Sequence, residues 1–102
     1  MRVTPDLRAE YEQRVRALAA LAERMRMDGA DAESIARKLH AERRALATQF
    51  KEMTPEPLRT RIHDRTVAVY GDPLGPSIDY LRARGRSWDD IIQSAIRPGE
   101  MP

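Results

Sequence analysis

The sequence of 102 residues contains no cysteine, only two lysines, two histidines and no long hydrophobic run. Without cysteine the chain has no disulfide bond, no zinc–thiolate site and no thiol nucleophile. A membrane-spanning helix needs about 20 predominantly apolar residues, and no such stretch is present. The first residues run directly into charged positions, without the apolar segment of a secretory signal. These absences favour a small domain that does not insert into a membrane, and we expect a cytoplasmic location.

Charged residues are abundant but nearly balanced, because 18 Lys and Arg residues stand against 16 Asp and Glu residues, for a formal net charge of +2. That excess is too small to indicate a nucleic-acid partner by itself. Sixteen of the 18 basic residues are arginine, whose planar guanidinium binds phosphate or carboxylate. A GC-rich genome is an alternative reason for this bias. The basic surplus lies in residues 1–51, with 11 basic and 8 acidic side chains, against 7 and 8 in residues 52–102.

Helix start and stop signals predict two long helices in the first half of the chain. Thr4-Pro5-Asp6 is a helix start, Gly29 is the expected C′ residue of that helix, and Asp31 is the N-cap of the next. Each helix is about 22 residues long, and the very short turn between them predicts antiparallel packing. Their apolar stripes have helical spacing. The stripes are Leu7, Tyr11, Val15, Leu18, Ala22 and Met25, then Ile35, Leu39, Leu46, Phe50 and Met53.

The second half of the chain predicts three shorter helices. Thr54-Pro55-Glu56-Pro57 repeats the Thr-Pro start signal, and Leu58, Ile62 and Val69 follow on one side of the helix that it opens. Residues 70–76 hold two glycines and two prolines and predict a structured loop.

A short helix is expected from Ser77 to Arg84, ended by Gly85, and Ser87-Trp88-Asp89-Asp90 is a capping signature for the last one. No strand pattern competes. The predicted fold class is all-α: a long antiparallel helical hairpin, about 4–53, packed against three shorter helices, about 54–98, in one domain spanning 1–102.

The apolar stripe of the second helix is interrupted, because Glu42 and Arg43 stand where apolar residues are expected. His40 lies one turn before Arg43 and Arg44, so these three side chains share a helix flank. An imidazole can move a proton near neutral pH while two guanidinium groups hold a phosphodiester. The three residues therefore form a candidate catalytic site. The alternative is an exposed histidine beside arginines that form salt bridges.

Three other positions are candidates for a functional role. His63, on the third helix, is a possible second acid or base, or part of a solvated basic face. Tyr70 and Asp72 border the Gly- and Pro-rich loop and can aim a phenol and a carboxylate at a ligand, or can serve the turn alone. Trp88 is more typical of a core or interface anchor than of a base-stacking platform.

Other familiar site patterns are absent from the sequence. Residues 27–39 are typical of the first helix of a helix-turn-helix unit, but residues 40–44 continue as helix where the turn is required. Residues 81–88 have such a turn, yet the following helix presents Asp89, Asp90 and Ile91 instead of a basic face. DNA binding is therefore not expected. There is no glycine-rich phosphate loop, no metal-ligand spacing and no Ser-His-Asp order, so we expect no cofactor and no metal.

A set of short motifs resembles the C-terminal toxin modules of bacterial polymorphic toxins of the contact-dependent inhibition, filamentous-haemagglutinin and Rhs type. The resemblance covers about residues 30–99. Its motifs are Ile35-Ala36-Arg37, His40-Ala41, Arg43-Arg44, Thr54-Pro55, Tyr70-Gly71-Asp72-Pro73-Leu74-Gly75-Pro76, Gly85-Arg86-Ser87-Trp88, Ile91-Ile92-Gln93-Ser94-Ala95 and Arg97-Pro98-Gly99.

The resemblance implies a toxin used in bacterial competition, delivered into the cytoplasm of a target cell as part of a larger secreted protein, and a cognate immunity protein as partner. Such modules are commonly nucleases, frequently acting on tRNA, and the substrate implied here is tRNA or another RNA. The first functional hypothesis is therefore a metal-independent ribonuclease, with His40 as general acid or base, Arg43 and Arg44 on the phosphate, and Tyr70 with Asp72 orienting the site. The second is a non-enzymatic helical interaction module, either an antitoxin or immunity protein or an adaptor.

Overall fold

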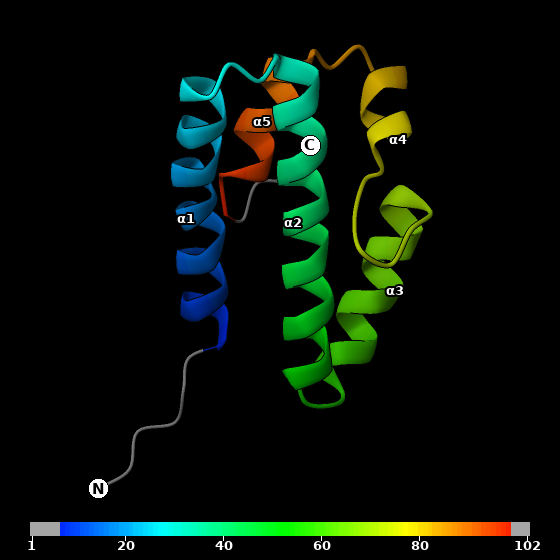
Figure 1. Cartoon of the computed structure of the whole chain (residues 1–102). Helices are drawn as coiled ribbons and strands as arrows, with labels where there is room; N and C mark the ends of the chain where they lie inside the picture. The colour runs from blue at the N-terminus through cyan, green and yellow to red at the C-terminus, as the bar shows by residue number, and fades with distance from the viewer. Residues whose placement is uncertain (1–6, 99–102) are drawn as a thin grey trace, which may run out of the picture.

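The computed structural model describes residues 7–98, and every regular element in that range is a helix (Figure 1). The fold class is all-α, as predicted. Five helices are present in the described part of the chain: α1 (Leu7–Met27), α2 (Ala32–Met53), α3 (Leu58–Tyr70), α4 (Ile78–Ala83) and α5 (Trp88–Ala95). The predicted start signal Thr4-Pro5-Asp6 lies outside the described residues. Within residues 7–98 no helix is both long and apolar enough to cross a bilayer.

The turn between α1 and α2 is built as the sequence predicts. Gly29 adopts a φ of 87°, which favours glycine, and the Ala30 N–H donates to the Met25 carbonyl at 2.9 Å. Asp31 then caps α2, because its side chain accepts a hydrogen bond of 2.8 Å from the Ser34 N–H. These local bonds end one helix and begin the next within four residues, and α1 and α2 consequently lie side by side as an antiparallel hairpin (Figure 1).

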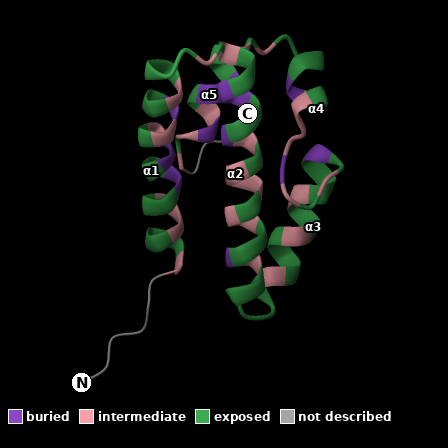
Figure 2. Ribbon diagram, in the orientation of Figure 1, coloured by how far each residue is buried: buried purple, intermediate pink, exposed green. Residues whose placement is uncertain are grey.

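Helix α5 covers one half of this hairpin and completes the core there. Its start is fixed by a capping box in which Ser87 and Asp90 exchange hydrogen bonds of 3.0 and 3.1 Å. Ile91 and Ile92 are each 1% exposed. They belong to a cluster of buried side chains drawn from α1, α2, α4 and α5 (Figure 2). The cluster is Leu18, Ala22, Ile35, Ala36, Leu39, Leu81, Ile91, Ile92 and Ala95.

Helix α3 differs from its prediction in both start and burial. It begins at Leu58 and not at Thr54-Pro55, because Thr54 is the C-cap of α2, with its hydroxyl donating to the Phe50 carbonyl at 2.7 Å. Within α3 only Tyr70 is buried. Leu58 and Ile62 are 49% and 47% exposed, so the apolar side of α3 is not part of the core.

The loop after α3 and the short helix α4 bring the chain back toward α5. Gly71 ends α3 in the left-handed region, with φ of 69°. Ser77 caps α4 by accepting a hydrogen bond of 3.0 Å from the Tyr80 N–H. The Tyr80 ring packs edge-on against Tyr70, with centroids 5.4 Å apart. The loop is thus held at both ends, beside α2.

Candidate functional site

Arg43, predicted to hold a phosphate, holds the C-terminal end of α5. One terminal nitrogen of its guanidinium, Nη1, donates to the carbonyl oxygens of Ser94, Ala95 and Arg97 at 2.7, 3.1 and 3.2 Å. The last carbonyls of a helix have no partner within the helix and carry partial negative charge, so a cation there stabilises the helix end. The Arg43 Nε also faces the Tyr11 hydroxyl, at 3.4 Å. Arg43 therefore joins α1, α2 and α5.

Arg44 contacts a different segment, the loop between α3 and α4. Its Nη2 contacts both carboxylate oxygens of Asp72, at 3.2 and 3.0 Å. Asp72 in turn accepts a hydrogen bond of 2.8 Å from the Leu74 N–H. That backbone bond first, and then the Arg44 guanidinium, lower the pKa of the Asp72 carboxyl below its ordinary value. The pair is about 70% shielded from solvent and fixes the loop to α2.

His40 is bonded to the same loop, one turn before Arg44. Its Nε2 lies 2.8 Å from the Pro76 carbonyl oxygen, which can only accept, so Nε2 carries the proton. Burial lowers the pKa of the imidazole, and the nearby positive charges of Arg44 and Arg43 lower it further, against the opposing effects of the Pro76 carbonyl and Asp72. The imidazole is therefore neutral at physiological pH, and its Nδ1, the basic nitrogen, has no hydrogen bond within residues 7–98.

The remaining predicted residues are placed as follows. Tyr70 is buried, and burial raises the pKa of its phenol. His63 does not join His40: its Nδ1 lies 2.6 Å from Nζ of Lys51, at the far end of α2. Trp88 lies between the guanidinium groups of Arg37 and Arg82, which are 5.1 and 4.2 Å from its ring centroid. The structure thus brings His40, Arg44 and Asp72 together and leaves His63 and Trp88 apart from them.

A trough of about 660 Å³ opens between α1, α2 and α3, and the predicted site residues His40, Arg43, Arg44 and Tyr70 are part of its lining. Helix α5 closes one end of it, since Ile91, Ser94 and Ala95 are part of its lining. The floor and walls are largely apolar. The apolar lining side chains come from all three walls: Leu7 and Tyr11 from α1, Ala47 and Phe50 from α2, Leu58 and Ile62 from α3, and Leu74 from the loop.

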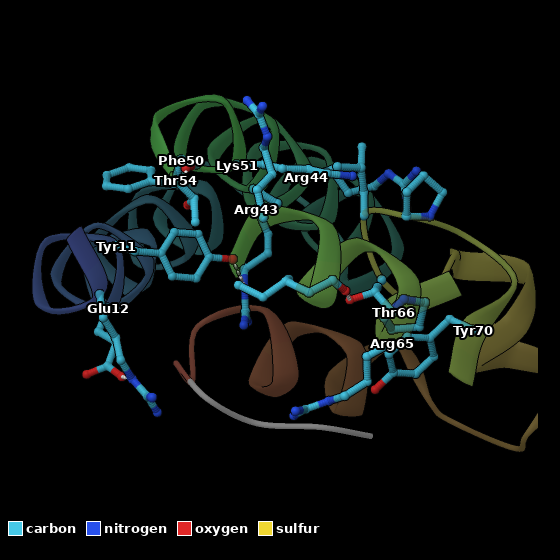
Figure 3. A pocket seen from close by; sticks show the side chains of 18 of the residues that line it. Tyr11, Glu12, Arg43, Arg44, Phe50, Lys51, Thr54, Arg65, Thr66 and Tyr70 are labelled. Carbon is cyan, nitrogen blue, oxygen red and sulfur yellow. Dashed lines mark hydrogen bonds and ion pairs between the residues drawn. The ribbon is translucent and has the colours of Figure 1, made fainter. Parts of the chain in front are cut away.

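Figure 3 shows this trough from close by. The Tyr11 ring points from α1 toward the middle, where its hydroxyl meets Arg43. Arg65, which lines the trough from α3, extends into the lower part of the view, apart from that contact. The Tyr11 ring also packs edge-on against Phe50, with centroids 5.4 Å apart. The aromatic side chains are thereby held in place on the walls of the trough.

The charges that line the trough are predominantly positive. Six cationic side chains and one carboxylate, that of Glu12, are found in the lining within residues 7–98. The cations are Arg8, Arg43, Arg44, Lys51, Arg59 and Arg65. Three of them have a carboxylate partner, because Arg8 bonds to Glu12, Arg44 to Asp72 and Arg59 to Glu56.

The other three cations have no carboxylate partner in the described part of the chain. Arg43 contacts carbonyls, Lys51 contacts His63, and Arg65 makes no hydrogen bond or ion pair within residues 7–98. Nη1 of Arg44 is in addition buried without an acceptor among these residues. The trough therefore combines apolar walls with cations that no carboxylate of residues 7–98 neutralises.

Sequence reasoning did not find this trough. Its apolar residues on α1 and α2 were assigned to stripes and expected to be covered, since a helix with one apolar face normally packs that face against another element. One signal was present in the sequence: the last helix spans only eight residues against 22 in α2, too few to cover the hairpin along its whole length.

Within residues 7–98 no group of three or more histidine, aspartate or glutamate side chains is arranged to hold a metal ion. Comparison of the chain with protein-family models, with curated proteins and with solved structures finds no match. Arguments about function therefore depend on the site itself.

Proposed function

We propose that this protein is a non-enzymatic helical interaction module that binds a segment of a partner protein in the trough. The observation that carries the proposal is the trough of about 660 Å³, whose largely apolar lining is not covered by any part of residues 7–98. A contiguous exposed apolar surface with a polar rim is typical of a protein-interaction site. The polar candidates Arg43, Arg44 and His40 support the same view, because each is hydrogen-bonded within the fold. We place such a module in the cytoplasm.

Selection from a library of helix-stabilised peptides, with apolar face and charge varied independently, tests this proposal. Ile62→Asp puts a carboxylate inside the trough, whereas Val69→Asp is a matched control on the same helix. The two side chains are 47% and 48% exposed, and Val69 does not line the trough. Because burying an isoleucine contributes about 1.5–3 kcal/mol, we expect trough-bound peptides to lose at least about tenfold in affinity with Ile62→Asp.

The Val69→Asp variant should retain the wild-type affinity for the same peptides. If the library yields no peptide that distinguishes the two variants, the trough is not a docking site and the proposal is wrong.

A second candidate function is the ribonuclease toxin implied by the resemblance, with an immunity protein as its partner. One observation favours it: His40, with a free Nδ1, lies beside Arg44 and Asp72. Inducible expression in a bacterium, followed by electrophoresis of total tRNA, tests it. The control is His40→Gln, which keeps a donor for the Pro76 carbonyl but cannot accept a proton. Growth arrest and tRNA cleavage that depend on His40 would support the toxin, and intact tRNA with normal growth would exclude it.

A further inference from the structure

The unfilled length of the hairpin fits one more helix of about three turns. At 1.5 Å per residue, the 22 residues of α2 span about 33 Å and the eight residues of α5 about 12 Å. About 20 Å of the hairpin therefore extends beyond α5, and Figure 1 shows α1 and the lower half of α2 without a helix between them there. A helix of about 13 residues has this length. In that place it would continue the layer that α5 begins.

The trough walls have the spacing that a helix recognises. Leu58 and Ile62 are four residues apart on α3, and Leu7 and Tyr11 are four residues apart on α1, so each wall presents a vertical pair of apolar side chains. An amphipathic helix inserts residues at positions i, i+3, i+4 and i+7 between such walls. A segment that binds by strand addition would in contrast need a strand edge, and residues 7–98 contain no strand.

The charge of the rim selects among possible helices. Arg65 has no partner within residues 7–98, Lys51 contacts only His63, and the one lining carboxylate, Glu12, is already bonded to Arg8 at 3.2 Å. A helix with carboxylates beside its apolar face would neutralise these cations, whereas a helix with lysines there would face unpaired positive charge.

The same charges disfavour a second copy of this chain as the occupant. In a two-fold symmetric contact each trough would face its own duplicate, so Arg65, Lys51 and Arg43 would meet the same three cations across the axis. Like charges at an interface oppose association. A partner of opposite charge is therefore required.

From these observations we propose that the trough takes an acidic amphipathic helix of another protein, about 13 residues long, with its apolar face on Tyr11, Phe50 and Ile62 and a carboxylate on Arg65. This proposal rests on the proposed interaction function and adds the chemical class of the partner.

The test uses three helix-stabilised 14-residue peptides that share one apolar face and differ only in their flanking residues, which are Glu, Gln or Lys. Affinities for the full-length protein are measured by fluorescence anisotropy at low and high salt. We expect the Glu peptide to bind about fivefold to tenfold more tightly than the Gln peptide, and the Lys peptide more weakly than both. The preference should shrink as salt screens the charges.

Two matched protein variants locate the charge effect. Arg65→Glu reverses a lining charge, and Arg61→Glu reverses another exposed charge on α3 that does not line the trough. Arg65→Glu should remove the preference for the Glu peptide and favour the Lys peptide, while Arg61→Glu should leave the order unchanged. Because both residues are exposed, neither variant is expected to unfold the protein.

The outcomes separate the two proposals. If the Glu and Gln peptides bind equally and both lose affinity with Ile62→Asp, the trough binds helices but the acidic partner is wrong. If no peptide shows sensitivity to Ile62→Asp, the interaction function itself is wrong.

A dimer in sedimentation equilibrium that dissociates with Ile62→Asp would assign the trough to a second copy and overturn the proposal. Competition with oleate tests an anionic lipid as the occupant. If oleate does not displace the Glu peptide, and binding of that peptide depends on Arg65, the result supports a protein helix over an anionic lipid.

Discussion

Arg43→Met removes the guanidinium that holds the end of α5 while it keeps most of the aliphatic stem. In the wild-type chain Nη1 donates to three carbonyls, those of Ser94, Ala95 and Arg97. A hydrogen bond to a charged group contributes about 1.5–3 kcal/mol, and a cation at a helix C-terminus about 0.3–1 kcal/mol. Since the three bonds share one donor group, we do not add them, and we expect a loss of about 2–3 kcal/mol.

Urea unfolding followed by circular dichroism at 222 nm measures this loss. For a domain of this size, 1 kcal/mol corresponds to about 4–8 °C in Tm, so the melting temperature should fall by about 10–20 °C. Arg43→Lys keeps the charge but not the planar donor group, and should lose about half as much. Arg14→Met is the control, because Arg14 is exposed and makes no hydrogen bond or ion pair within residues 7–98, and it should change stability by less than about 0.5 kcal/mol.

Hydrogen exchange then shows where the change acts. The amides of α5 should exchange faster in Arg43→Met, because the end that Arg43 holds would fray, while those in the first half of α2 should change less. If Arg43→Met is as stable as Arg14→Met, the contact to α5 contributes nothing and the structural role assigned to Arg43 is refuted. In that case a loss of function in the same variant would have to come from a ligand.

Two other predictions concern His40 and Ser87. The pKa of His40 is lower in the folded chain than in the unfolded chain. The free energy of unfolding should therefore be highest above about pH 6.5 and should decrease as the pH drops from there toward the folded pKa. His40→Gln should remove this part of the slope in unfolding free energy measured between pH 7.5 and 5.5, and an unchanged slope would contradict the assignment. Ser87→Ala removes the capping box of α5 and should lower the unfolding free energy, measured by urea titration, by about 1 kcal/mol. Ser34→Ala is the control and should have a smaller effect, because it leaves the backbone N–H that Asp31 caps.

Helix boundaries that depend on a single local bond were predictable from the sequence. Asp31, Ser77 and Ser87 each accept a hydrogen bond from a backbone N–H three residues ahead. Asp31 and Ser87 were recognised as caps from residue type, and Ser77 was predicted as the start of its helix. The prediction at Thr54 failed because two helices meet there. The Thr54 hydroxyl bonds back to the Phe50 carbonyl and ends α2, and α3 starts only after Pro57.

The candidate site was less predictable, because its meaning depends on contacts between distant parts of the chain. The polar break at Arg43 was correctly recognised as unusual for an apolar stripe. What the sequence could not supply was the partner, which lies about 50 residues away at the end of α5. The apolar residues of α3 were likewise visible, but their exposure depends on how far α5 extends, which is a property of the packed hairpin.

The positive charges of the trough have two different origins, and this difference decides which of them indicate a partner. Arg43 is explained by the fold alone, because carbonyls that end a helix against an apolar hairpin need a donor there. Arg44 is explained by Asp72 in the same way. Arg65, which lines the trough from α3, has no such explanation within residues 7–98. The case for an acidic partner therefore depends chiefly on Arg65, and the exchange of that single charge is the most direct test of it.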